Sequence, residues 1–158
     1  MRTRLGVCTT IAVALVLTGS AISASAVARA GRSLQSTDVK HSVWDGVYTD
    51  EQAKRGESHY GRACEMCHGA DLSGNDVDEI PALAWDAFLT HWSDRTLKDL
   101  YDSMRRAMPR DKPGSLSARA YADLVAYILQ VNKFPSGSTE LGLNPDVLGS
   151  IVISGRKP

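Results

Sequence analysis

Two segments of the chain carry apolar side chains at the i, i+3, i+4 and i+7 spacing of an amphipathic helix. The first spans 96–107, and Pro109 follows closely enough to end it. Its apolar stripe consists of Leu97, Leu100, Tyr101 and Met104. The second spans about 117–131 and opens with Ser117, a residue type that caps helices well. Its stripe consists of Tyr121, Leu124, Val125, Ile128 and Leu129. We therefore predict an amphipathic helix in each segment.

Two further helices are predicted nearer the N-terminus. Residues 49–63 can be capped by Thr49 or Asp50, and the acidic first turn favours the positive end of a helix. Residues 81–92 carry five apolar or aromatic side chains, namely Leu83, Trp85, Phe88, Leu89 and Trp92. The stretch between them, 64–80, is rich in Gly, Asp, Asn and Ser and is predicted to be mostly loop. Strand alternation is weak throughout the sequence and no repeat is evident, so the predicted fold class is all-α.

The first 28 residues have the pattern of a secretory signal peptide. A basic start is followed by the apolar run 11–17 and then by small residues ending in Ala26-Val27-Ala28, which fits cleavage after Ala28 or after Ala26. An uncleaved membrane anchor is the alternative, but the seven-residue apolar run is too short to span a bilayer comfortably. We therefore expect a periplasmic or otherwise exported protein with no stable membrane span after cleavage.

Removing residues 1–28 changes what the composition indicates. The full chain balances 18 basic against 18 acidic residues, whereas the remainder has 16 against 18, a net charge of −2. Such a balance is not typical of a nucleic-acid-binding protein, and we expect no nucleic-acid partner. In this remainder we predict a flexible lead-in (29–48), a folded domain (49–135), and a C-terminal tail (136–158) that packs on or extends from the domain.

The two cysteines outside the signal peptide lie in the run Cys64-Glu-Met-Cys67-His68. A C-x-x-C-H run is the pattern of c-type haem attachment. Two thiols on one helical turn can reach the two vinyl groups of a porphyrin, and the following imidazole can ligate its iron. A thioredoxin-like redox pair, a structural zinc site and a simple disulfide are alternatives. The first normally follows a strand, the second needs four ligands, and the third makes no use of His68.

The sixth iron ligand is predicted to be a methionine sulfur, because a thioether opposite histidine favours ferrous iron and raises the reduction potential. Met66 lies inside the attachment turn and cannot reach the opposite face, and Met104 belongs to an apolar stripe. Met108 lies forty residues after His68, where a helix ends before a proline. Met108 is therefore the predicted ligand, with His91 as the reserve candidate.

These residues resemble class I cytochrome c, and most closely the small cytochrome c domains of quinohaemoprotein alcohol dehydrogenases and their stand-alone relatives. The resemblance covers about 46–141 and rests on the order and spacing of several short motifs. They are Cys64-Glu-Met-Cys-His68-Gly69, Gly69-Ala-Asp-Leu-Ser-Gly74, Pro81-Ala-Leu83, Phe88-x-x-x-Trp92, Met108-Pro-x-x-x-Pro113-Gly-Ser-Leu116, Tyr121-Ala-Asp-Leu-Val-Ala-Tyr-Ile-Leu129 and Asn132-Lys-Phe-Pro135. One departure is Trp85, which stands where this family usually has glycine.

The resemblance implies supporting roles for further residues. It places the first and last helices across each other, with contacts among Gly56, Tyr60, Leu124 and Tyr127. It implies that the Pro81 carbonyl accepts the Nδ1–H of His68, which would fix the ring and raise its basicity. It also implies a position for Trp92 near the haem propionates, although a lone aromatic side chain is equally typical of a core.

The predicted function is one-electron transfer by a monohaem cytochrome with one covalently bound haem c, not catalysis. The expected partners are redox proteins, such as a quinoprotein dehydrogenase and a terminal oxidase or another cytochrome. Two alternatives remain: a haem electron-acceptor subunit of a quinoprotein dehydrogenase complex, and a ligand-binding or peroxidase-like haem protein with an open sixth site. Four basic residues surround Met108, namely Arg105, Arg106, Arg110 and Lys112. They could steer an acidic redox partner or neutralise haem propionates.

Overall fold

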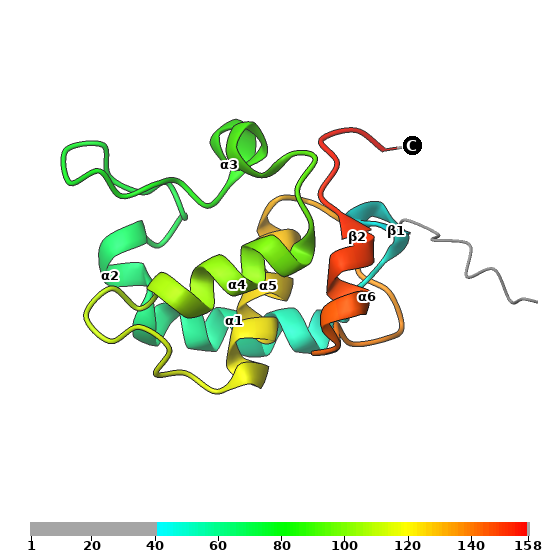
Figure 1. Cartoon of the computed structure of the whole chain (residues 1–158). Helices are drawn as coiled ribbons and strands as arrows, with labels where there is room; N and C mark the ends of the chain where they lie inside the picture. Colours follow the sequence, from blue (N-terminus) through cyan, green and yellow to red (C-terminus); the bar gives the residue numbers. More distant parts are fainter. Residues whose placement is uncertain (1–40, 158) are drawn as a thin grey trace, which may run out of the picture. The chain divides into compact units, whose positions relative to one another are not determined.

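The computed structural model describes residues 41–157 (Figure 1). Its five helices between residues 50 and 131 are α1 Asp50–Ala63, the short α2 Glu65–His68, α3 Trp85–Trp92, α4 Leu97–Ala107 and α5 Ala118–Val131. The remaining elements are shorter, namely β1 His41–Ser42, η1 Val43–Asp45, α6 Pro145–Ser150 and β2 Ile151–Val152. The described part is all-α apart from one two-stranded pairing, as predicted. The predicted signal peptide lies outside the described residues.

Helices α1, α4 and α5 begin and end within one residue of the predicted positions, whereas α3 begins at Trp85, four residues after the predicted start at 81. Thr49, Thr96 and Ser117 are the N-caps of α1, α4 and α5, and each side-chain oxygen accepts a hydrogen bond from a backbone N–H three residues on. The stripes of α4 and α5 are largely buried in one core, which includes Leu97, Leu100, Tyr121, Val125 and Leu129. α1 packs most extensively against α5. None of the described helices is both long enough and apolar enough to cross a membrane.

Residues from both the predicted lead-in and the predicted tail belong to this core. The lead-in was expected to be flexible, whereas packing of the tail on the domain is one of the two arrangements expected for it. Val43 and Tyr48 are buried, and the Tyr48 hydroxyl donates to the Phe134 carbonyl oxygen at 2.6 Å. From the tail, Leu148 and Ile153 are buried. The other buried tail residues are Leu141 and Ile151. Strand β1 pairs with β2 in parallel, so the two ends of the described chain lie side by side (Figure 1).

Candidate haem-attachment turn and its supports

The Cys64–His68 run forms a single helical turn directly after α1. Cys64 is the junction residue, and its carbonyl oxygen accepts hydrogen bonds from the Cys67 N–H at 3.1 Å and the His68 N–H at 2.9 Å. Cys64 is half-buried and Cys67 is exposed, and both are free thiols. Two thiols and one imidazole therefore lie on the same turn, with one thiol reachable from solvent.

The Cys64 thiol is not activated as a redox nucleophile. Burial, and to a lesser degree the nearby Cys67, raises the pKa of Cys64 to about 11. A disulfide oxidoreductase has the opposite property, because its attacking cysteine has a depressed pKa and is largely thiolate at neutral pH. This observation argues against the thioredoxin-like alternative.

The His68 ring is held by one nitrogen and open at the other. The side chain is buried, with 6% of its surface exposed, and Nδ1 lies 3.0 Å from the Pro81 carbonyl oxygen. Because a carbonyl only accepts, Nδ1 carries the proton and Nε2 has the free lone pair. Nε2 makes no hydrogen bond with the described residues, and it is not fully buried. A nitrogen presented in this way is suited to ligate a metal.

The loop between α2 and α3 carries Pro81 to its position against His68. Gly74 makes this path possible, because its φ is +70° and a Cβ there would lie 2.7 Å from both the Pro81 carbonyl carbon and the Ala82 nitrogen. The Leu83 N–H then donates to the Leu72 carbonyl at 2.8 Å, which closes the loop over the buried Leu72 side chain. Gly74 belongs to a motif of the family resemblance, but the motif does not predict its close contact with the backbone of Pro81 and Ala82.

Trp85 begins α3 with φ of +59°, in the left-handed region that favours glycine. This conformation gives a physical reason for the glycine that the resemblance leads us to expect at this position. The Asn132 side chain holds the turn from the end of α5, accepting from the Trp85 N–H at 2.8 Å and donating to the Leu83 carbonyl at 3.0 Å. The loop therefore keeps its path despite the bulky residue.

Met108 follows the last residue of α4 in an extended conformation, with φ of −123° and ψ of +152°. Its N–H still donates to the Met104 carbonyl oxygen at 2.8 Å, so the backbone leaves the helix at this residue. Its own carbonyl oxygen accepts from the Tyr121 hydroxyl at 2.7 Å and from the Gly114 N–H at 3.2 Å. The half-buried side chain is therefore attached to a backbone held by three hydrogen bonds.

Trp92 belongs to the core and also borders an open depression of about 390 Å³. The Arg95 guanidinium lies 5.5 Å from the centre of the Trp92 ring, within the range of a cation–π interaction. The other lining residues are His91, Asp99, Asp102, Ser103 and Arg106. Neither His68 nor Met108 lines this depression, and the exposed His91 ring stacks edge-on against Trp92.

The crossing of α1 and α5 lies next to the attachment turn and contacts it through Tyr60. A Cβ added to Gly56 would collide with the Asp123 carbonyl oxygen and lie 2.8 Å from Tyr127 Cβ, so the two backbones are in direct contact. One turn further along, the Tyr60 and Tyr127 rings lie 5.4 Å apart. The Tyr60 hydroxyl donates to the Gly69 carbonyl at 2.6 Å, directly after the attachment turn, and burial raises the pKa of this phenol. Leu124 is buried at the same crossing.

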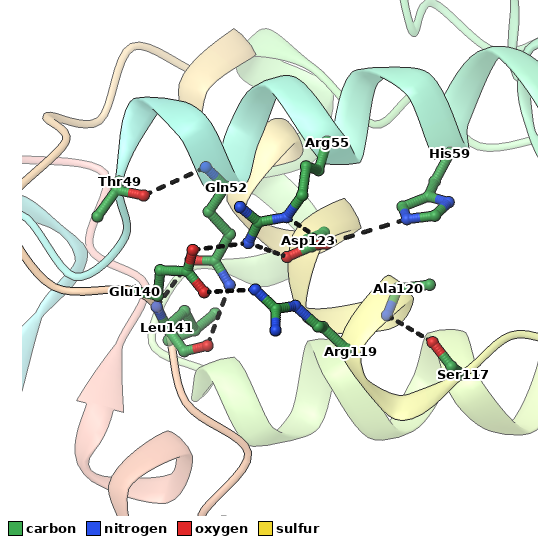
Figure 2. Close-up of polar contacts among 10 residues, drawn as sticks. All are labelled: Thr49, Gln52, Arg55, His59, Ser117, Arg119, Ala120, Asp123, Glu140 and Leu141. Carbon is green, nitrogen blue, oxygen red and sulfur yellow. Dashed lines mark hydrogen bonds and ion pairs between the residues drawn. The ribbon is translucent and has the colours of Figure 1, made fainter.

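A polar network on this helix pair was not anticipated from the sequence (Figure 2). Asp123 on α5 has only 2% of its side chain exposed and accepts two hydrogen bonds from Arg55 on α1, each of 3.0 Å. Arg55 also contacts Glu140 at 2.8 Å. Gln52 is buried and pairs through its amide with both backbone groups of Leu141, at 2.7 and 3.0 Å. These hydrogen bonds connect the tail to α1. Their partners lie 68 to 89 residues apart in the sequence, so no local sequence pattern predicts them.

Comparison with known proteins places these elements in context. Residues 51–128 match the family model described as cytochrome c oxidase, cbb3-type, subunit III, a span that contains the attachment turn, Pro81 and Met108. Among solved structures, the sulfane dehydrogenase SoxCD from Paracoccus pantotrophus matches at 22% identity, over 69% of this chain and 61% of that chain, with a TM-score of 0.48. A comparison with curated protein sequences found no significant match.

Proposed function

We propose that this all-α chain, whose residues 51–128 match the family model of cytochrome c oxidase, cbb3-type, subunit III, is an exported monohaem carrier of single electrons. The observation that carries the proposal is the geometry of His68, a buried imidazole fixed at Nδ1 by Pro81 with Nε2 open. That arrangement follows directly after two cysteines on the same turn, within a family matched over the same residues.

The residues present fit a covalently bound haem c. Cys64 and Cys67 would hold its edge by two thioether bonds, and Nε2 of His68 would ligate its iron from one side. The hydrogen bond from Nδ1 to Pro81 orients the ring and increases the donor strength of Nε2. When bound, the haem iron supplies a one-electron couple between its ferric and ferrous states.

Met108 is proposed as the second axial ligand. It has left α4 and is free of helical side-chain packing, whereas Met104 still belongs to the helix and Met66 is exposed on the attachment turn. As a soft, neutral ligand, the Met108 sulfur would stabilise ferrous iron and would leave no open position for an external ligand. These properties suit an electron carrier and not a peroxidase or a gas-binding protein.

The side chains around α4 are proposed to face the charged edge of the haem and its partners. Arg95 and Arg106 border one depression beside Trp92, together with Asp99 and Asp102, and these two arginines would be the candidate partners of propionate carboxylates. The exposed Arg105 and Arg110 extend this basic region and would attract an acidic surface on a redox partner. The name of the matched family favours a terminal oxidase or another cytochrome among such partners, and a quinoprotein dehydrogenase remains a candidate electron donor.

The test is to produce the chain in a host that attaches haem and to purify it from the exported fraction. Its intact mass should correspond to a chain that begins after Ala28 or after Ala26 and carries one haem, and Cys64→Ala with Cys67→Ala should abolish covalent haem. A mass without haem, or a full-length precursor, would contradict the proposal of an exported monohaem cytochrome.

Axial ligation is tested on the same protein by adding carbon monoxide to the ferrous form. We expect slow or no binding to the natural chain and to Met104→Ala, which removes a neighbouring methionine, but rapid binding to Met108→Ala. Rapid binding by the natural chain would indicate an open sixth site. Slow binding by Met108→Ala would assign the sixth ligand to another residue, with His91→Ala as the next variant.

A further inference from the structure

The Met108 carbonyl oxygen is bound by the hydroxyl of Tyr121, at 2.7 Å. This is a contact between the end of α4 and the first turn of α5, across the loop that joins them. The Gly114 N–H reaches the same oxygen at the longer distance of 3.2 Å. The phenol is therefore the stronger of the two donors that hold the Met108 peptide on its carbonyl side.

Tyr121 is itself fully buried. Its side chain has 0% of its surface exposed, and its ring packs edge-on against Tyr101 of α4 with 6.3 Å between ring centres. A hydrogen bond from a fully buried donor has no competing water on the donor side. On the other side of Met108, its N–H is held by the Met104 carbonyl at 2.8 Å. The Met108 backbone is thus hydrogen-bonded to both helices, at its N–H by α4 and at its carbonyl oxygen by α5.

We propose that Tyr121 is a positioning residue that holds the Met108 backbone so that its sulfur remains at the iron. This inference rests on the proposed function, since it assumes ligation by Met108. A ligand on a loop must be kept in place by its surroundings, because each degree of backbone freedom lowers the fraction of molecules in which the sulfur is correctly placed. A weaker hold would open the sixth position part of the time and admit an external ligand.

The experiment compares Tyr121→Phe with Tyr101→Phe in the haem-loaded full chain. Both variants remove one phenol hydroxyl from the same buried pair, but the Tyr101 hydroxyl donates to the Ala118 carbonyl, at 3.4 Å, and not to Met108. The readouts are the apparent affinity of the ferric protein for imidazole, the methionine-to-iron charge-transfer absorption, and unfolding by denaturant.

We expect Tyr121→Phe to bind imidazole about three- to tenfold more tightly than the natural chain, the range that corresponds to losing one buried hydrogen bond. Its charge-transfer absorption should persist, because the sulfur still binds most of the time. Tyr101→Phe should leave imidazole affinity unchanged. A purely structural role for Tyr121 would lower the unfolding free energy without altering the affinity, and equal affinities in the two variants would overturn the inference.

Met108→Ala separates this inference from the proposed function. If Met108→Ala binds imidazole much more tightly and Tyr121→Phe does not, only the positioning role is wrong. If Met108→Ala leaves the affinity unchanged, Met108 is not the ligand, and both the proposed ligation and the positioning role fall.

Discussion

Gly56 of α1 lies in direct backbone contact with Asp123 of α5. A side chain of even one carbon at Gly56 would collide with the Asp123 carbonyl oxygen and come within 2.6 Å of its carbonyl carbon. The contact sets the distance between the two helices that form the main packing of the fold. Tyr60 lies one turn after Gly56 on α1, and its hydroxyl donates to the Gly69 carbonyl oxygen next to the attachment turn. The contact between Gly56 and Asp123 therefore also helps to position the attachment turn relative to α5.

We expect Gly56→Ala to lower the free energy of unfolding by at least about 2 kcal/mol, because both backbones would have to separate. Gly61→Ala is the matched control on the same helix, since its Cβ would meet only the flexible Glu65 carboxylate at 3.3 Å. That control should stabilise the helix by up to about 1 kcal/mol. Denaturant unfolding of the haem-loaded variants measures both effects, and equal stabilities would contradict the assigned role of the contact.

The helix boundaries were predictable because the signals for them are local. Each of the capping residues Thr49, Thr96 and Ser117 stands directly before its helix, and the apolar stripes repeat within a few residues. Strands of two residues have no such repeat, so the pairing of β1 with β2 left no pattern to detect. The expectation of a flexible lead-in over 41–48 was wrong for that reason, and the sequence left open whether the tail packs on the domain.

The part of the candidate site that has a local sequence signal was also predictable. The Cys64–His68 turn is a contiguous motif, whereas the contact of His68 with Pro81 was expected only from the family resemblance. Tyr121 was correctly placed on a buried stripe, but periodicity says nothing about the target of its hydroxyl. The partner of Asp123 lies on another helix, and only the three-dimensional fold brings the two together.

Trp85 offers a test of backbone conformation at the start of α3. Its φ of +59° disfavours any residue with a Cβ by about 1 kcal/mol or more, and 52% of its surface is exposed. We therefore expect Trp85→Gly to be more stable to denaturant than Trp85→Ala by about 1 kcal/mol, although both variants lose the indole. Equal stabilities, or a more stable alanine variant, would show that the left-handed conformation is not maintained in solution.

The buried carboxylate of Asp123 is expected to be the most sensitive member of the polar network in Figure 2. Asp123→Ala would remove the buried partner of Arg55 and leave it only the exposed Glu140 carboxylate, and we expect a loss of about 1–3 kcal/mol in unfolding free energy. Arg119→Ala removes a contact with Glu140 at 3.3 Å from a largely exposed arginine, and it should cost less than about 1 kcal/mol. A similar loss of unfolding free energy in both variants would mean that the burial of Asp123 does not make its ion pair with Arg55 more stabilising than the exposed pair of Arg119 with Glu140.

The Asp99 carboxylate should make the start of α4 sensitive to acid. It accepts from the Thr96 N–H at 3.0 Å and from the Thr96 hydroxyl at 2.8 Å, and these two hydrogen bonds hold the pKa of Asp99 below its usual value. Because the folded pKa is depressed, the stabilisation is present above the unfolded pKa of about 3.9 and is lost as pH falls through the folded value.

Asp99→Asn removes this titration, and we expect it to lower the unfolding free energy by about 1 kcal/mol near neutral pH. The difference from the natural chain should begin to shrink as pH falls below about 4, and it should vanish once pH is below the depressed folded pKa of Asp99, where this side chain is neutral as well. Ser117→Ala is the control, because Ser117 caps α5 by accepting from the Ala120 N–H at 3.1 Å without a carboxylate partner. In urea unfolding, Ser117→Ala should lower the unfolding free energy by a similar amount near neutral pH and below about pH 4. A constant difference for Asp99→Asn across this range would mean that the Asp99 charge does not stabilise α4.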